Sequence, residues 1–325
     1  MRVAVLDDYH RVFEQDPAIK RLRQQAPVDV FTEKLPSLEG LKGYSVLIAL
    51  RERTRFDERF FARVPGLELI AQTGNHAYHV DLAAATRAGV LVAMGSSDMA
   101  AMADMAASTV ELTFGLMLAL LRHIPQTDRA MRDGQWSSVL GHTLRGKRLG
   151  LLGLGRMGRE VARIAKAFGM EVLAWGPTLT PERAAQSGAE LMELDQLLEA
   201  SDIVSIHLRL SGQSRGLIGE ARLRRIGPRS VLINTARGAI VDEAALARVL
   251  EERALGGAAL DVFVDEPLPA DSPLRSLDNL VMTPHLGWPA DLTYRYMAEA
   301  VVQIVEAYLD GSCDRALNPE AMHHR

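Results

Sequence analysis

Three segments of the chain place a reactive side chain just beyond an apolar run that is typical of a buried strand. The side chains are Arg237, Glu266 and His285, and they follow the runs at 230–234, 257–261 and 280–282 in that order. Ligands of open α/β sheets bind outside the carboxyl ends of the strands. The placement therefore predicts that the three residues share one site.

These three side-chain types suit the reduction of a carbonyl that lies beside a carboxylate. A guanidinium such as that of Arg237 can hold a carboxylate bidentately and polarise the neighbouring carbonyl. A histidine such as His285 can deliver a proton near neutral pH while hydride arrives at carbon. A carboxylate such as Glu266 would orient that imidazole. Each residue alone also has an ordinary explanation as a surface or turn residue, so the prediction rests on their joint placement.

A glycine pattern lies between an apolar strand and an amphipathic helix. It reads Gly153-Leu154-Gly155-Arg156-Met157-Gly158, after the run at 148–152. Gly153 permits a tight turn, Gly155 lets a pyrophosphate approach the backbone, and Gly158 lets the helix pack closely on the strand. The helix N-terminus offers free N–H groups and a positive dipole end to phosphates. The pattern predicts a dinucleotide-binding turn.

The preference between NAD and NADP stays open. A fold of this type usually ends its second strand with an acid, about 20 residues on, that binds the ribose 2′-OH of NAD. This chain has Gly176 there, and the nearest basic residue is Arg183. For want of a basic partner for a 2′-phosphate, the sequence weakly favours NAD.

Short β-branched runs alternate with helical stretches along the chain. Five strands are predicted at 3–6, 28–31, 46–50, 67–71 and 90–92, and six more at 148–152, 171–174, 203–207, 230–234, 257–261 and 280–282. An apolar helix at about 100–122 would bridge two domains, and a last helix at 291–309 would return to the first one. This rhythm predicts two α/β domains with parallel sheets, both doubly wound and Rossmann-like.

Composition excludes several classes of protein. The 325 residues carry a net charge of −4, with 48% apolar and 24% charged residues. We therefore expect neither a nucleic-acid footprint nor a membrane-binding surface. The single cysteine, Cys313, excludes an intramolecular disulfide and a cysteine-based zinc site. We predict no metal site, no export signal and a cytoplasmic location.

The later motifs together resemble the D-isomer-specific 2-hydroxyacid dehydrogenases. They are the glycine turn, Asn234-Thr235-Ala236-Arg237-Gly238, Ala259-Leu260-Asp261-Val262-Phe263 with Asp265-Glu266-Pro267, and Thr283-Pro284-His285-Leu286-Gly287. The resemblance implies an NAD(P)-dependent enzyme that transfers a hydride at C2 of a small 2-oxo or 2-hydroxy acid, including the glyoxylate or hydroxypyruvate reductase type. It also implies a cofactor domain at 100–287, inserted into a substrate domain at 1–99 and 288–325. A homodimer would form through the cofactor domains.

The resemblance also implies roles for particular residues. Arg237, Glu266 and His285 would be catalytic, and Asp261 would lie near the nicotinamide carboxamide. The cofactor-binding set would be Gly153, Gly155, Arg156, Met157, Gly158, Gly176, His207, Thr235, Ala236, Arg237, Asp261, His285 and Gly287. The substrate-binding set would be Arg51, Gly74, Asn75, His76, Ala77, Arg237, His285 and Trp288.

Some positions depart from the family pattern, and two other functions remain open. The loop at 74–77 is bulkier and more polar than usual, Leu112 follows Glu111 where the family has histidine, and Trp288 replaces a small residue. One alternative is a formate dehydrogenase-like enzyme, although that class has glutamine in place of Glu266. The other is a non-catalytic, NAD-binding scaffold of the corepressor type.

Overall fold

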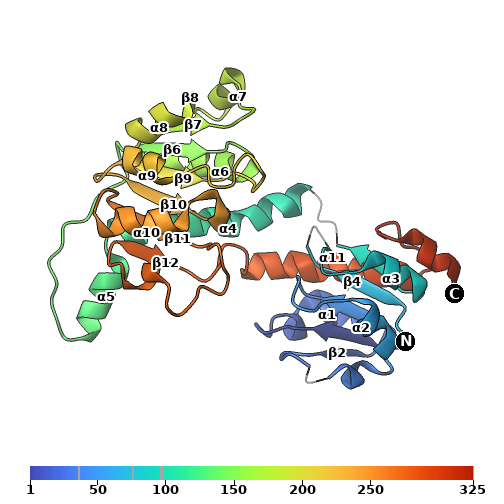
Figure 1. The fold of residues 1–325 in the computed structure, drawn as a ribbon. Helices are drawn as coiled ribbons and strands as arrows, with labels where there is room; N and C mark the ends of the chain where they lie inside the picture. Colours follow the sequence, from blue (N-terminus) through green and yellow to red (C-terminus); the bar gives the residue numbers. More distant parts are fainter. Residues whose placement is uncertain (36, 75–76, 96–98, 325) are drawn as a thin grey trace. The chain divides into compact units, whose positions relative to one another are not determined.

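The structure is a computed structural model that describes residues 1–35, 37–74, 77–95 and 99–324. It divides into two compact units, each with its own parallel sheet (Figure 1). Unit 1 comprises Met1–Met105 with Ala290–Arg325, and unit 2 comprises Ala106–Pro289. The predicted fold class, two doubly wound α/β sheets, is confirmed.

Unit 1 contains a five-stranded parallel sheet in the order β2-β1-β3-β4-β5. This is one of the two common orders of a doubly wound sheet. All five predicted strands are present, because four are short, buried aliphatic runs and the edge strand β2 places valines on either side of Asp29. Their bounds are Val3–Leu6 (β1), Val28–Val30 (β2), Val46–Ala49 (β3), Leu69–Gln72 (β4) and Leu91–Met94 (β5).

Short helices cover the sheet of unit 1. They are α1 (Pro17–Leu22), α2 (Glu58–Arg63) and α3 (Leu82–Arg87). An aspartate precedes each one and accepts a hydrogen bond from a backbone N–H of the first turn; the three are Asp16, Asp57 and Asp81. This satisfies a donor that a helix N-terminus otherwise leaves unpaired.

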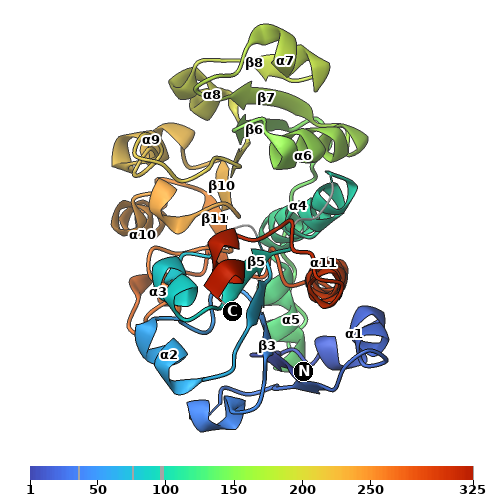
Figure 2. The ribbon, with the colours of Figure 1, turned by 90° about the vertical axis from the view of Figure 1, so that its right-hand side faces the viewer.

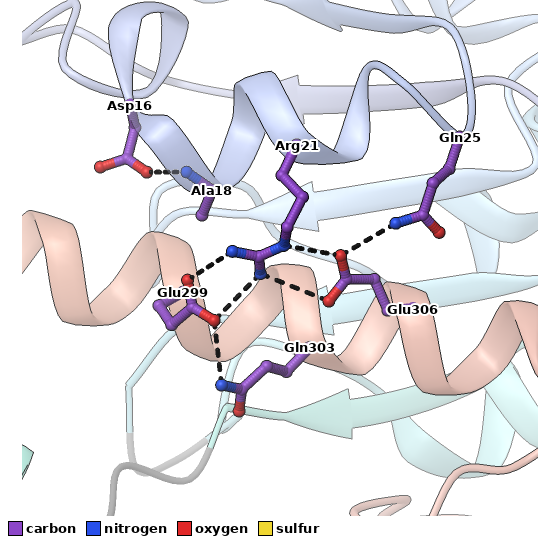
Figure 3. A network of polar contacts seen from close by, with 7 residues as sticks. All are labelled: Asp16, Ala18, Arg21, Gln25, Glu299, Gln303 and Glu306. Atoms are coloured by element: carbon purple, nitrogen blue, oxygen red, sulfur yellow. Dashed lines mark hydrogen bonds and ion pairs between the residues drawn. The ribbon is translucent and has the colours of Figure 1, made fainter.

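The long helix α11 (Asp291–Leu309), whose bounds are those predicted, completes unit 1. Its apolar face is buried, and it packs against α1. Figure 3 shows Arg21 of α1 reaching between two acids of α11, with distances of 2.9 Å to Glu299 and 2.9 Å to Glu306. The guanidinium of Arg21 lowers the pKa of Glu299 through a direct hydrogen bond. Because these groups are partly exposed, the buried apolar face holds α11 and the ion pairs fix its register.

Unit 2 contains a seven-stranded parallel sheet in the order β12-β11-β10-β9-β6-β7-β8. Its strands are β6 (Arg148–Leu152), β7 (Glu171–Trp175), β8 (Glu190–Leu191), β9 (Ile203–Ile206), β10 (Val231–Asn234), β11 (Gly257–Leu260) and β12 (Leu280–Met282). Six were predicted. The prediction missed β8, because two residues at the sheet edge form no apolar run. Figure 2 shows β8, β7, β6, β10 and β11 in this succession.

Helices cover both faces of the second sheet. Successive strand residues point to opposite faces, so Val231 and Ile233 of β10 join one apolar cluster and Leu232 joins the other. The first cluster includes α4 (Met99–Leu121) and α6 (Arg156–Ala167). The second includes α8 (Leu194–Ala200), α9 (Glu220–Ile226) and α10 (Glu243–Glu251), while α7 (Pro181–Gln186) follows β7.

A long excursion separates α4 from β6. It contains α5 (Ile124–Arg132), none of whose residues is buried, and a following loop with Trp136 88% and Leu140 87% exposed. Its base is closed by a hydrogen bond of 2.9 Å from the His142 N–H to the Leu121 carbonyl. We call residues 123–141 the arm; Figure 1 shows it standing away from the sheet of unit 2.

In the described part of the chain, no single helix is long and apolar enough to cross a membrane. The bent pair of residues 106–121 and α5 reaches that length and composition only when taken together.

Candidate active site

The glycine turn lies at the carboxyl end of β6, where the sequence predicted it. Gly153 has φ 101°, in the left-handed region that favours glycine, and a Cβ there would lie 2.8 Å from the His207 carbonyl oxygen. A Cβ on Gly158 would overlap the Gly153 carbonyl. Packing therefore requires the first and third glycines of the pattern.

The middle glycine is different, because packing does not require it. Gly155 is the N-cap of α6, and apart from its chain neighbours no described atom lies within 4 Å of where its Cβ would be. Arg156 and Met157 begin the first turn of α6 beside it. Open space above a helix N-terminus is what a pyrophosphate needs. The turn therefore fits the predicted dinucleotide.

The next strand ends without a charged side chain. Gly176 follows Trp175 of β7, and a Cβ on it would meet the Leu179 Cβ at 3.4 Å. Arg183 of α7 donates a hydrogen bond of 2.8 Å to the Thr178 carbonyl, so its guanidinium lies against the same loop. The structure therefore provides no carboxylate at position 176 to repel a 2′-phosphate.

His207 lies at the end of β9, against the glycine turn. Its Nε2 is 2.9 Å from the Ser205 hydroxyl, and burial lowers its pKa to about 4. The ring is therefore neutral at physiological pH. His207 is suited to contact a ligand through hydrogen bonds and van der Waals contacts rather than through an ion pair.

The turn that carries Arg237 follows β10 and is organised by Asn234. The buried Asn234 side chain accepts a hydrogen bond from the Ala236 N–H at 3.0 Å and donates one to the Arg237 carbonyl at 3.1 Å. A Cβ on the next residue, Gly238, would overlap the backbone of Phe263. Glycine at 238 therefore lets the Arg237 turn approach the loop that carries Glu266.

Glu266 and His285 form a pair across two loops. The His285 Nδ1 lies 2.7 Å from the Glu266 Oε2, and the side chains are about one-third exposed, at 35% and 36%. The other oxygen, Oε1, accepts a hydrogen bond of 2.9 Å from the Phe263 N–H. An ionised carboxylate can only accept, so Nδ1 is the donor and Nε2 is the nitrogen available for proton transfer. The sequence predicted these partners, and the structure brings them together.

Asp261 organises the turn that carries His285, a role that sequence reasoning missed. This buried carboxylate accepts hydrogen bonds from the Thr283 hydroxyl at 2.6 Å and from the N–H groups of Leu286 at 2.6 Å and Gly287 at 2.8 Å. His285 itself has φ 56°, a conformation that costs an L-residue on the order of 1 kcal/mol. The three hydrogen bonds hold the turn in that conformation.

Predicted substrate residues of unit 1 gather at the carboxyl ends of β3 and β4. Arg51 has φ 59°, and its backbone N–H donates to the Thr73 hydroxyl at 2.8 Å. Its guanidinium reaches Gly74, where a Cβ would lie 3.3 Å from the Arg51 Nη1. Asn75 and His76 lie outside the described residues. Ala77 follows in the same loop, and Trp288 stands half-buried next to Gly287 in unit 2.

Metal binding is not indicated at these positions. Among the described residues, no three His, Cys, Asp or Glu side chains are grouped in a way that could hold a metal ion.

Comparison with known proteins defines the class to which this fold and site belong. Residues 114–287 match the D-isomer specific 2-hydroxyacid dehydrogenase, NAD binding domain. A glyoxylate reductase of Korarchaeum cryptofilum is 32% identical over 304 residues, which cover 90% of both chains. The chain belongs to the D-isomer-specific 2-hydroxyacid dehydrogenase family, as its motifs predicted.

Other relatives match most of this chain but differ in length. A D-3-phosphoglycerate dehydrogenase of Methanocaldococcus jannaschii is 34% identical over 96% of this chain, but the match covers 58% of that protein. For a second one, from Archaeoglobus fulgidus, it covers 45%, so the chain spans about half the length of these two relatives. The crystal structure of a phosphoglycerate oxidoreductase of Vibrio cholerae O395 has a TM-score of 0.82 and is 33% identical. That similarity covers 96% of this chain and all of that one.

Proposed function

We propose that the protein is a nicotinamide-dependent oxidoreductase that transfers a hydride at C2 of a small 2-oxo or 2-hydroxy acid. The observation that carries the proposal is the His285–Glu266 pair, held at 2.7 Å next to the turn of Arg237. The glycine turn lies at the carboxyl edge of the same sheet. The relative named glyoxylate reductase supports this reaction class.

Each residue of this site has a distinct task in the proposed reaction. Arg237 binds the substrate carboxylate and polarises the C2 carbonyl, which a planar guanidinium can do with two N–H groups. His285 donates a proton from Nε2 to the carbonyl oxygen, and Glu266 holds the ring through Nδ1. The cofactor, when bound at the glycine turn, supplies the hydride. In the oxidative direction His285 accepts the proton instead.

We propose that the predicted domain at 100–287, most of which is unit 2, binds the cofactor, and that residues 1–99 with 288–325 form the substrate domain. In that domain Arg51 and the backbone of the loop that begins at Gly74 would bind an anionic group of the substrate. The 3.3 Å approach of the Arg51 guanidinium to the Gly74 Cβ position supports this role. Trp288 would shape the space around the acid's side chain.

For the cofactor, we propose NAD as the main partner, with NADP accepted as well. Gly176 provides no carboxylate that would bind a ribose 2′-OH or repel a 2′-phosphate. Arg183 lies against the same loop through its hydrogen bond to Thr178. Discrimination between the two cofactors should therefore be weak.

We propose that the protein forms a homodimer and that the arm takes part in it. The arm presents large apolar side chains to solvent, with Trp136 88% and Leu140 87% exposed. Exposed aromatic and aliphatic anchors of this kind are typical of protein interfaces. The resemblance to the family, which implied a dimer through the cofactor domains, points to a second copy as the partner.

One experiment tests the reaction, the substrate class and the cofactor together. The protein is assayed with a panel of 2-oxo acids, from glyoxylate and hydroxypyruvate to aromatic and phosphorylated acids, each with NADH and with NADPH. Turnover of at least one acid that is lost in His285→Ala supports the proposal. Oxidation of formate instead would identify a formate dehydrogenase-like enzyme. Tight NADH binding without any turnover would favour a non-catalytic scaffold.

A further inference from the structure

Three hydroxyl side chains of α4 contact the two loops that carry Arg237 and His285. They are Ser108, Thr109 and Thr113, which we call the hydroxyl clamp. Thr109 and Thr113 are four residues apart and so lie on one face of the helix. All of these groups belong to unit 2, and neither the sequence motifs nor the family resemblance assigned them a role.

The first contact is with the turn that carries His285. The Gly287 carbonyl accepts hydrogen bonds from the Ser108 hydroxyl at 2.8 Å and the Thr109 hydroxyl at 2.6 Å. Its N–H donates to Asp261 at 2.8 Å. A carbonyl oxygen has two lone pairs, and here both are used. A Cβ on Gly287 would come within 3.0 Å of the Asp261 carboxylate and 3.3 Å of the Thr109 methyl, so the glycine fits a space bounded on both sides.

The second contact is with the turn that carries Arg237. The hydroxyl oxygens of Thr113 and Thr235 lie 3.0 Å apart, and both residues are buried. The Thr113 hydroxyl donates its one proton to the Thr109 carbonyl at 2.8 Å. The Thr235 hydroxyl must therefore be the donor between the two. Because a buried hydroxyl that loses its partner is destabilising, this contact restrains Thr235, two residues before Arg237.

We propose that the hydroxyl clamp is a positioning device that sets the distance between Arg237 and His285 by tying both of their turns to one helix. The inference rests on the proposed function, in which these two residues act on the same carboxylate and carbonyl. His285 is in a left-handed conformation that a free turn would leave, so the attachment at Gly287 keeps its Nε2 directed toward the substrate. A shift of about 1 Å in such a pair costs up to about 100-fold in rate.

The test removes the hydroxyls while keeping side-chain shape. Ser108→Ala/Thr109→Val takes both donors from the Gly287 carbonyl, and Thr113→Val takes the partner from Thr235. We expect kcat for the best 2-oxo acid to fall about 10- to 100-fold. The dissociation constant for NADH should rise by a smaller factor than kcat falls. The kinetic isotope effect on kcat with NADH deuterated at the transferred position should rise, because hydride transfer becomes rate-limiting.

Two matched variants separate positioning from general damage. Thr109→Ser keeps the hydroxyl and should retain wild-type kcat. Ser276→Ala removes a hydroxyl elsewhere in unit 2, where it donates 2.9 Å to the Pro273 carbonyl, and should change nothing. If the double variant does not fold, the single variant Thr109→Val is measured in its place. The Gly287 carbonyl then keeps its hydrogen bond from Ser108.

The proposal is overturned if the folded clamp variants keep kcat within about twofold of wild type, or if NADH binding and kcat weaken in proportion. His285→Ala, measured alongside, separates this result from the fate of the proposed function. If His285→Ala is inactive and the clamp variants are normal, only the clamp proposal fails. If His285→Ala stays active, the proposed function itself fails.

Discussion

The His285 turn and the arm are both loops of unit 2, but they are built in opposite ways. In the turn, Asp261 and the hydroxyl clamp satisfy the polar groups around His285 with five hydrogen bonds from within the unit. In the arm, none of the residues of α5 is buried, and Trp136 and Leu140 face solvent. The turn is therefore held by groups of its own unit, whereas the arm leaves large apolar side chains exposed, which is why we propose a second copy as its partner. Four predictions test this contrast.

The largest effect is expected at the turn itself. His285→Ala should lower the rate of 2-oxo acid reduction by about 10²- to 10⁴-fold, because it removes the proton donor. Glu266→Gln should cost less, since the ring keeps a neighbour that can accept its Nδ1 proton. NADH binding, measured by fluorescence titration, should weaken by a smaller factor than the rate falls in both variants. Retention of more than about one-tenth of the activity in His285→Ala would contradict the mechanism.

The next effect is expected at the arm. Trp136→Ala/Leu140→Ser should raise the dimer dissociation constant at least about 30-fold, which corresponds to the roughly 2 kcal/mol of an interface anchor. Analytical ultracentrifugation over a concentration series would measure it. Gln135→Ala, on the same exposed segment, is the matched control and should leave association unchanged. A wild-type protein that is monomeric at all concentrations, or a double variant that associates normally, would refute this role of the arm.

A smaller effect is expected at the loop after β7, where Gly176 offers no carboxylate to the adenosine ribose of the cofactor. Gly176→Asp should shift the ratio of kcat/KM values for NADH and NADPH by about tenfold toward NADH, because a carboxylate binds the 2′-OH and repels a 2′-phosphate. Gly176→Ala is the control, since it adds only the Cβ that meets Leu179 at 3.4 Å. If the aspartate leaves the ratio unchanged, the adenosine ribose does not lie at this loop.

The last effect concerns protein stability at His207, which lies against the glycine turn. The pKa of His207 is lowered from 6.5 to about 4 by burial, so the unfolded chain binds a proton below about pH 6.5 that the folded protein does not. The free energy of unfolding should therefore fall as the pH drops from 6.5 toward 4. Urea titrations at several pH values would measure the fall. His207→Gln should lose less stability over this range, and an equal loss in both proteins would assign the effect to other groups.

Much of the fold was predictable from the sequence, because parallel strands buried on both faces leave short β-branched runs such as Val46–Ala49. The motifs around Gly153, Arg237 and His285 predicted the family, which the comparisons confirmed. Two structural features left no such signal. The strand β8 has only Glu190 and Leu191, and in the arm the exposed tryptophan has the side chain of an ordinary core residue.

The support of the candidate site was also hidden from the sequence. Ser108, Thr109 and Thr113 stand in a helix that was interpreted as a plain apolar bridge, and nothing in their spacing shows which loops they meet. Asp261 was placed near the cofactor by resemblance, yet its three hydrogen bonds to the His285 turn depend on the pairing of β11 with β12. Contacts of this kind depend on strand order, which a local pattern does not encode.

The ion pairs of Arg21 with Glu299 and Glu306 join side chains that are almost 300 residues apart, at separations of 278 and 285. Unit 2 lies between them in the sequence as one continuous segment. During synthesis, all of unit 2 therefore leaves the ribosome before α11 does. The translation of unit 1 begins first, but the unit is completed last, because α1 packs against a helix near the C-terminus. A chain that ended after residue 289 would contain all of unit 2, while the apolar side of unit 1 that α11 covers would stay exposed to chaperones and proteases.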